Sequence, residues 1–175
     1  MIEQAKLKRV YDYVISNKKT NVSRVQNRND EMIEWVLVFE LDNSHKEIGI
    51  TQNGYWGIKL PYHFSILDKE SSLLFFIVLL EHPIEDIERK LSSSLNKFMD
   101  LSKTNKVFPF LELVKFIFDY NSSSYWIDLA FKWYEQFTFS EKQVLKESID
   151  KLVANNSISQ KTRQKAKREL NSTPG

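Results

Sequence analysis

Residues 32–60 read MIEWVLVFELDNSHKEIGITQNGYWGIKL, and this stretch decides the fold class. It is rich in β-branched and aromatic residues, and its short apolar runs are separated by the polar segments DNSHK and QNGY. This pattern is typical of strands joined by turns. The Asn53-Gly54 pair predicts a type I′ turn, because both residue types tolerate positive φ. We therefore expect a small antiparallel β-meander at about 33–60.

Helices are predicted on both sides of this meander. On the N-terminal side, residues 2–16 have apolar side chains at helical spacing, and the polar segment after them predicts a loop. From Glu70 onward the pattern indicates helix throughout. Residues 84–101 carry one apolar stripe behind Pro83, a residue suited to the first helical position. The stripe consists of Ile84, Ile87, Leu91, Leu95, Phe98 and Leu101.

Further helices are predicted toward the C-terminus. After Pro109 only Glu112, Lys115 and Asp119 are charged, which indicates a helix buried nearly all round. Ser140 and Gln143 have the spacing of a capping box, with Phe139 and Val144 placed as a hydrophobic staple, so a helix is predicted from Ser140 to about Asn155 with Val144 inward. Ser159 then predicts the cap of a last helix that runs to about Leu170.

The composition is that of a folded protein with few turns. The chain has 175 residues, of which 42% are hydrophobic and 27% charged, and it contains four glycines and four prolines. We predict an α+β fold that is predominantly α, with the meander in the N-terminal third packed on a bundle of five or six helices. Residues 1–171 are expected to form a single domain, with a β-like region at about 33–60 and the bundle at about 70–170, and residues 172–175 a disordered tail.

The sequence also indicates a cytoplasmic protein. It has no cysteine, which fits a reducing compartment, and its N-terminus has polar and charged residues where a signal peptide needs an apolar run. The longest apolar run, LLFFIVLL at 73–80, is far shorter than the roughly 20 residues that span a bilayer.

No pattern of catalytic residues is found. The histidines His45, His63 and His82 lack metal-ligand spacing, and we interpret them as surface or capping residues. Clustered acids such as Glu85 and Asp86 are explained by the first turn of a helix, where carboxylates complement the dipole. No glycine-rich phosphate loop is present. We expect a protein that is not an enzyme and has no catalytic, cofactor-binding or metal site.

A basic helix near the C-terminus raises one alternative function. Lysines and arginines are concentrated there: Lys161, Arg163, Lys165, Lys167 and Arg168. Together with the capped helix before it, this helix resembles a helix-turn-helix, and the alternative is a DNA- or RNA-binding regulator. The simpler interpretation, which we favour, is a solvated terminal helix that packs through a thin apolar seam.

An aromatic helix, SSSYWIDLAFKWYEQF at residues 122–137, is the other candidate for binding. Its wide apolar face is predicted to be core and consists of Trp126, Leu129, Ala130, Trp133 and Phe137. The opposite face carries Tyr125, Asp128, Lys132 and Glu135, with Asp128 and Lys132 spaced as an i, i+4 ion pair. Tyr125 is the aromatic residue left for a partner.

Residues 125–170 resemble the C-terminal part of small bacterial immunity proteins, the antidotes to polymorphic or contact-dependent growth inhibition toxins. The matching features are the YWxxLAxxW helix, the capped helix after it, and the SxSQKxRxKA segment at 157–166. Upstream, LLEHPIEDIERKL at 79–91 resembles the helix-proline-helix step of these proteins.

This resemblance implies a non-enzymatic protein that binds one toxin tightly, often a nuclease domain, and covers its active site or substrate surface. Such antidotes present acidic and aromatic groups to a basic cleft. Because the formal net charge here is +2, any acidic surface has to be local. The candidates for partner binding are Glu85, Asp86, Glu112, Asp119, Tyr120, Tyr125, Asp128 and Glu135, with Glu81 as a further acid.

Overall fold

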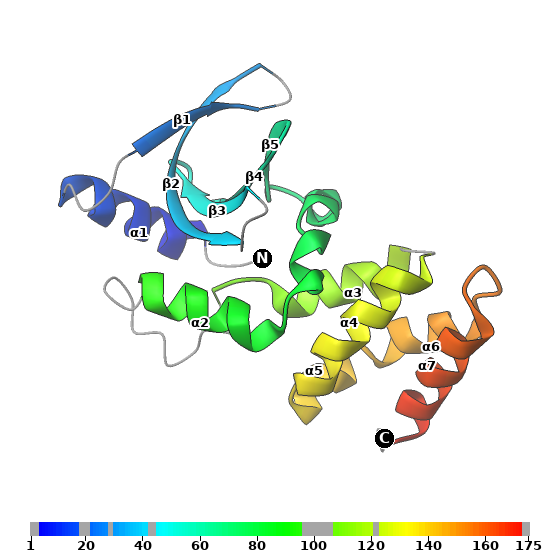
Figure 1. The fold of residues 1–175 in the computed structure, drawn as a ribbon. Helices are drawn as coiled ribbons and strands as arrows, with labels where there is room; N and C mark the ends of the chain where they lie inside the picture. Colours follow the sequence, from blue (N-terminus) through cyan, green and yellow to red (C-terminus); the bar gives the residue numbers. More distant parts are fainter. Residues whose placement is uncertain are drawn as a thin grey trace. The chain divides into compact units, whose positions relative to one another are not determined.

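The computed structural model describes residues 4–17, 22–27, 30–41, 45–95, 107–120 and 123–172. The elements are α1 (Gln4–Ser16), β1 (Val22–Gln26), β2 (Met32–Leu41), β3 (Lys46–Thr51), β4 (Trp56–Leu60), β5 (His63–Ile66), the 3₁₀ helices η1 (Glu70–Phe75) and η2 (Ile77–Glu81), α2 (Ile84–Leu95), α3 (Phe110–Tyr120), α4 (Ser124–Gln136), α5 (Phe139–Val144), α6 (Lys146–Ala154) and α7 (Gln160–Ser172) (Figure 1). The described residues are therefore mostly helical, with one antiparallel sheet in the N-terminal half, as predicted.

The chain divides into two compact units. Unit 1 comprises residues 1–76 and 86–109, and unit 2 comprises residues 77–85 and 110–175. Unit 1 contains the sheet, and α3 to α7 belong to unit 2. The expectations of a single domain and of a sheet packed on the bundle stay predictions.

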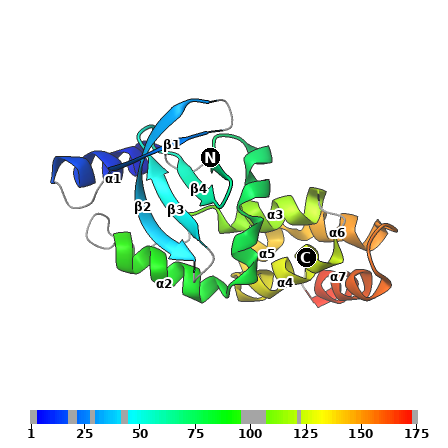
Figure 2. The same cartoon turned by 45° about the horizontal axis from the view of Figure 1, so that its top comes forward.

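The sheet of unit 1 is a curled meander in the order β1-β2-β3-β4-β5 (Figures 1 and 2). A bulge interrupts β2 between Leu37 and Phe39, and bulges increase the local twist of a strand. The two outer strands approach each other through a single parallel bridge between Asn27 and Phe64. The sheet is thus a nearly closed barrel, and it extends beyond the predicted range of 33–60 at both ends.

Both faces of the sheet are covered. Trp35 and Val36 are successive residues of β2, so they point to opposite faces, and both are buried. Helix α1 packs against β2 and β3 with Leu7, Val10 and Val14 buried. The helix predicted at residues 2–16 is confirmed as α1.

A pair of glycines makes room for two aromatic rings inside the curl. Gly49 of β3 is the direct cross-strand partner of Gly57 of β4. A Cβ on Gly49 would collide with the Val36 carbonyl and the Trp35 ring, and one on Gly57 would collide with the Phe64 ring. The Trp35 and Phe64 rings themselves meet edge to face, with centroids 4.9 Å apart. Absence of a side chain at 49 and 57 therefore allows this aromatic pair to fill the inner face.

The predicted turn at Asn53-Gly54 has a different geometry. A type I′ turn needs positive φ at both residues, but of this pair only Gly54 has it, at 75°. The Gly54 amide donates to the Thr51 carbonyl at 2.9 Å, and the Asn53 carbonyl accepts from Gln4 Nε2 at 3.0 Å. The turn is in the predicted place, and its predicted type is wrong.

Helix boundaries in unit 2 differ from the prediction at the start and at the end of α5. The N-cap of α5 is Thr138, whose hydroxyl accepts from the Glu141 amide while the Glu141 carboxylate accepts from the Thr138 amide. The predicted capping box of Ser140 and Gln143 is therefore two residues too late. Phe139 and Val144 are both exposed, so the predicted staple and the inward Val144 are also wrong. The predicted long helix is divided into α5 and α6 at the buried residue Leu145.

The other helices agree with the sequence pattern. Helix α2 starts directly after Pro83, and its stripe residues Ile84, Ile87, Leu91 and Leu95 are buried. Phe98 and Leu101, the last two members of that stripe, lie outside the described residues. Ser159 caps α7 by accepting from the Thr162 amide at 3.1 Å, as predicted. Residues 173–175 of the predicted tail lie outside the described residues, and Ser172 is the last residue of α7.

Candidate functional site

Helix α4 carries most of the residues of the candidate site, and one side of this helix is buried in the hydrophobic core. Its buried residues are Ile127, Ala130, Phe131, Trp133 and Tyr134. The predicted burial of Ala130 and Trp133 is confirmed, and Phe137 directly after the helix is also buried. Trp126 and Leu129, also predicted inward, are only half-buried. The buried stripe is thus rotated toward Phe131 and Tyr134, which leaves Trp126 at the edge of the core.

Tyr125 is the outward aromatic residue of α4, as predicted, with 56% of its surface exposed. Its hydroxyl donates to Glu81 Oε1 over 3.4 Å, and its ring meets the Trp126 ring edge to face at 5.0 Å. Partial desolvation, followed by the charge and the hydrogen bond of Glu81, raises the pKa of the Tyr125 phenol above its ordinary value. The phenol is therefore a hydrogen-bond donor at neutral pH and not a base.

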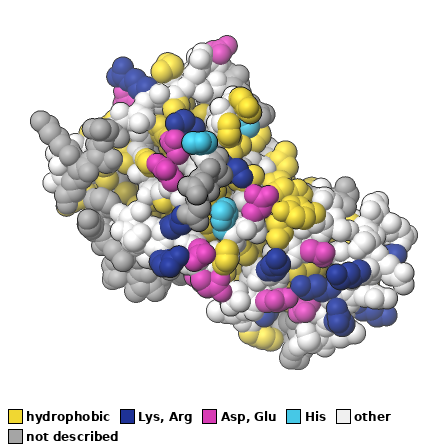
Figure 3. Space-filling view, in the orientation of Figure 1, with side chains coloured by type: hydrophobic (Ala, Val, Ile, Leu, Met, Phe, Trp, Pro, Cys, Tyr) yellow, Lys and Arg dark blue, Asp and Glu magenta, His cyan; other side chains and the backbone are white. Residues whose placement is uncertain are grey.

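Tyr120 is a second exposed aromatic residue, at the end of the preceding helix. It is the last residue of α3 and is 67% exposed, and its ring is 5.3 Å from that of Phe116. Since α4 begins at Ser124, the two tyrosines flank one short connection. We call Glu81, Tyr120, Tyr125 and Trp126 the junction surface. Figure 3 shows hydrophobic side chains gathered over the start of α4, with acidic side chains beside them.

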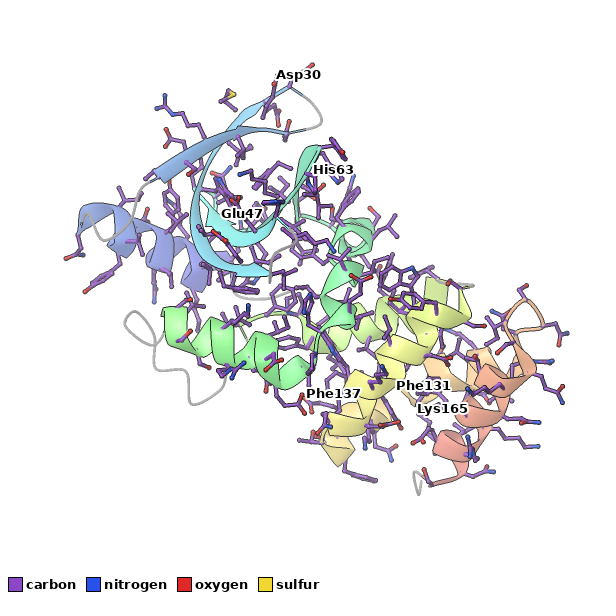
Figure 4. All side chains as sticks on the ribbon, viewed as in Figure 1. Asp30, Glu47, His63, Phe131, Phe137 and Lys165 are labelled. Carbon is purple, nitrogen blue, oxygen red and sulfur yellow. The ribbon has the colours of Figure 1, made fainter. Side chains whose placement is uncertain are left out.

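The acids of α4 are held by α7 rather than directed away from the protein. Glu135 accepts a salt bridge from Lys165 Nζ at 2.9 Å, and Asp128 accepts a hydrogen bond from the Thr162 hydroxyl at 3.3 Å. Lys165 also lies over the Phe131 ring, 5.0 Å from its centroid, and Figure 4 shows these two side chains together. Asp128 and Glu135, predicted as partner-binding residues, therefore fasten α7 to α4.

Asp119 is a largely buried member of the predicted set. Its side chain is only 8% exposed, and it accepts salt bridges from Lys115 at 2.6 Å and Lys151 at 3.4 Å. Burial by itself would raise the pKa of this carboxyl, but hydrogen bonds from Lys115 and Ser148 and the charges of Lys115 and Lys151 outweigh it and hold the pKa below its ordinary value of 3.8. Asp119 thus joins α3 to α6.

Asp119→Asn is expected to lower the free energy of unfolding at neutral pH by about 2 kcal/mol, because hydrogen bonds to a charged group are lost. A lowered folded-state pKa stabilises the fold above the unfolded value of 3.8, and this contribution is lost as the pH falls through the folded pKa. The difference between wild type and variant should stay constant from about pH 7 to pH 5 and shrink below about pH 4. Urea titrations at each pH measure it.

The exposed acid Asp150 of α6 provides the control for that experiment. Asp150→Asn should change the free energy of unfolding by less than about 0.5 kcal/mol. A difference between wild type and Asp119→Asn that did not depend on pH would contradict the ion-pair explanation.

The remaining predicted residues are divided between two helices: Glu85 and Asp86 are neighbours in the first turn of α2, and Glu112 lies in the first turn of α3. Glu112 and Glu85 are exposed and belong to unit 2. Asp86 belongs to unit 1 and pairs with Arg89 at 2.7 Å. Of the eight candidates, Tyr120 and Tyr125 are the two exposed aromatic residues, one at the end of α3 and one at the start of α4.

Trp126 is the member of the junction surface that sequence reasoning assigned to the core. A signal for its position exists in the sequence, because Ile127, Phe131 and Tyr134 form a second apolar stripe at helical spacing. If that stripe is the buried one, Trp126 moves to the boundary with solvent.

The pocket and the histidines of the described residues do not include the side chains of the junction surface. A pocket of about 220 Å³ is lined by Phe137, Phe139, Lys142, Glu169 and Ser172. Within the described ranges, no three His, Asp or Glu side chains are grouped as metal ligands. His45 has a positive φ of 52° in a turn, and the His82 carbonyl accepts from Trp133 Nε1.

Helices of the described part of the chain are all too short or too polar to cross a membrane. Comparison of the chain with protein-family models, with curated proteins and with solved structures finds no match to any of them.

Proposed function

We propose that this chain is an immunity protein that neutralises a bacterial toxin, a nuclease domain in our proposal, by binding it directly through the junction surface. The observation that supports this most is the exposed Tyr125 phenol, which is oriented by Glu81 and flanked by the Trp126 ring. Tyrosine and tryptophan supply large contact areas at protein interfaces with little loss of side-chain entropy. An exposed pair of this kind is suited to anchoring a partner.

The charge of unit 2 outside α7 favours a basic partner. Outside α7, unit 2 contains nine acidic and five basic residues. Glu81, Glu85 and Glu112 are exposed among them. Nuclease domains carry basic clefts for their substrates, and opposite charges accelerate association and fix the orientation of the partners. The proposed contact therefore combines exposed aromatic side chains with the carboxylate of Glu81 beside them.

The test is co-expression of this chain with the product of the gene beside its own. That product alone is expected to stop bacterial growth, and the chain is expected to restore it and to form a complex that survives gel filtration. If the neighbouring product is harmless, or if it is toxic but neither bound nor neutralised, the proposal is wrong.

Tyr125→Ala is expected to weaken this complex about 30-fold, the loss typical of an interface anchor of ~2 kcal/mol. Tyr62→Ala is the matched control, because Tyr62 is a tyrosine of unit 1 that is 97% exposed. Isothermal titration calorimetry of both variants gives the comparison. If both variants lose affinity equally, or if Tyr125→Ala loses none, the junction surface does not bind the toxin.

A further inference from the structure

Helix α7 has two sets of basic side chains with different surroundings. Its 13 residues include five basic residues and one acid, Glu169. Thr162 and Ala166 are buried and define the side that faces the protein. Lys165 bonds to Glu135, and Arg163 donates to Asn156 Oδ1 at 2.8 Å. Lys165 and Arg163 therefore bond to neighbouring parts of the protein and help to hold α7 in place.

The opposite side of α7 is basic and amide-rich. Its exposed residues are Gln160, Lys161, Gln164, Lys167, Arg168, Asn171 and Ser172, which we call the outer face of α7. In the described parts of the chain, neither Lys161, Lys167 nor Arg168 has a carboxylate partner. Lys161 and Arg168 are seven residues apart, so their Cα atoms are separated by about 10.5 Å along the helix axis. Figure 3 shows Lys and Arg side chains gathered over this helix.

We propose that the outer face of α7 binds the phosphate backbone of nucleic acid. Three unpaired cations on one helix face give an electrostatic attraction to phosphates, and Gln and Asn side chains add hydrogen bonds to phosphate and sugar oxygens. The face carries no acid that would repel a phosphate. This binding is a second activity of the chain, independent of the proposed antidote function.

The same face fits other macromolecules poorly. A helix that lies on a membrane buries apolar side chains in the lipid, and the outer face of α7 has none. Protein interfaces depend on aromatic or aliphatic anchors, which this face also lacks. Nucleic acid is the polyanion that a wholly polar, cationic helix face can bind without such anchors.

The packing of α7 against α6 supports binding of nucleic acid through the outer face of α7. Helix α7 packs against α6, and residues 155–159 connect the two helices. A supporting helix followed by an exposed basic helix is the arrangement in which the second helix meets DNA in helix-turn-helix proteins. An α-helix fits a major groove about 12 Å wide, whose rims carry the phosphates. The outer face therefore has both the charge and the support that backbone binding requires.

The experiment measures fluorescence anisotropy of a labelled 20-base-pair DNA duplex with the full chain at several salt concentrations. With three phosphate contacts, log K against log salt should have a slope of about −2.7. The variant K161Q/K167Q/R168Q should bind at least 10-fold more weakly at 50 mM salt and have a slope near zero. Circular dichroism checks that it is folded, as expected for three exposed side chains.

The matched control is R9Q/K69Q/K132Q. It removes the same residue types and the same charge at three exposed positions outside α7, and it should bind DNA like wild type. The proposal fails if wild type does not bind the duplex at 50 mM salt, if both triple variants lose affinity equally, or if the chain binds anionic phosphatidylserine vesicles and not the duplex. Tyr125→Ala should leave DNA binding unchanged, so this result is separate from that of the toxin test.

Discussion

Trp133→Ala is expected to lower the free energy of unfolding by about 4 kcal/mol, because a large aromatic side chain is removed from a packed core. Trp133 is 1% exposed, and its ring meets that of Phe110 edge to face at 5.4 Å. Its Nε1 also donates to the His82 carbonyl at 2.9 Å, which joins α4 to a segment 51 residues earlier in the chain. Urea denaturation followed by far-UV circular dichroism measures the loss.

Two further variants separate the contributions of this residue. Trp133→Phe keeps much of the ring packing but loses the hydrogen bond, so a smaller cost is expected, with about 1 kcal/mol from the bond. Trp126→Ala removes the half-buried tryptophan of the same helix and should cost less than half as much as Trp133→Ala. Equal losses of stability for Trp133→Ala and Trp126→Ala would contradict the observation that Trp133 lies in the core and Trp126 at its edge.

Gly49→Ala is expected to destabilise the sheet by about 3 kcal/mol, because the added methyl group overpacks the inner face. The methyl would collide with the Val36 carbonyl, which belongs to the backbone of β2, as well as with the Trp35 ring. Backbone cannot move without disturbing the ladder between β2 and β3. Chemical denaturation of the variant provides the measurement.

Gly57→Ala should cost less, about 2 kcal/mol, because its methyl would meet only the ring of Phe64 among its closest neighbours. Phe64→Leu should therefore relieve Gly57→Ala, with a favourable coupling of at least about 1 kcal/mol in a double-mutant cycle. The same replacement should not relieve Gly49→Ala. A cycle in which Phe64→Leu rescued both glycine variants equally would rule out the backbone collision at Gly49.

The fold class followed from sequence because most elements carry their own local signals. Short runs of β-branched and aromatic residues separated by polar turn segments indicated β2 to β4, and Pro83 and Ser159 marked the starts of α2 and α7. Strand β1 was missed because four of its five residues are exposed and only Val25 packs against the core, so the strand shows no alternation of apolar and polar residues. The start of α5 was misplaced because Thr138 to Glu141 and Ser140 to Gln143 are overlapping capping-box patterns, and local sequence cannot choose between them.

The candidate site was less accessible to sequence reasoning. The outward position of Tyr125 followed from the helical period alone. The roles of Asp128 and Glu135 did not, since their partners Thr162 and Lys165 lie 34 and 30 residues away in the chain. Asp119 looked like an exposed acid for the same reason, because Lys151 reaches it from α6. Contacts between distant helices decide which acids are available to a partner.

The single bridge between Asn27 and Phe64 has a consequence for behaviour at high concentration. The outer strands of a sheet present unpaired amide and carbonyl groups, and these can pair with the edge of a second copy and start aggregation. Here the two outer strands have five and four residues and approach each other in the same barrel. Because both outer strands are short, the edge that each could offer to a neighbouring copy is also short, and short edge strands are one way in which proteins limit such pairing.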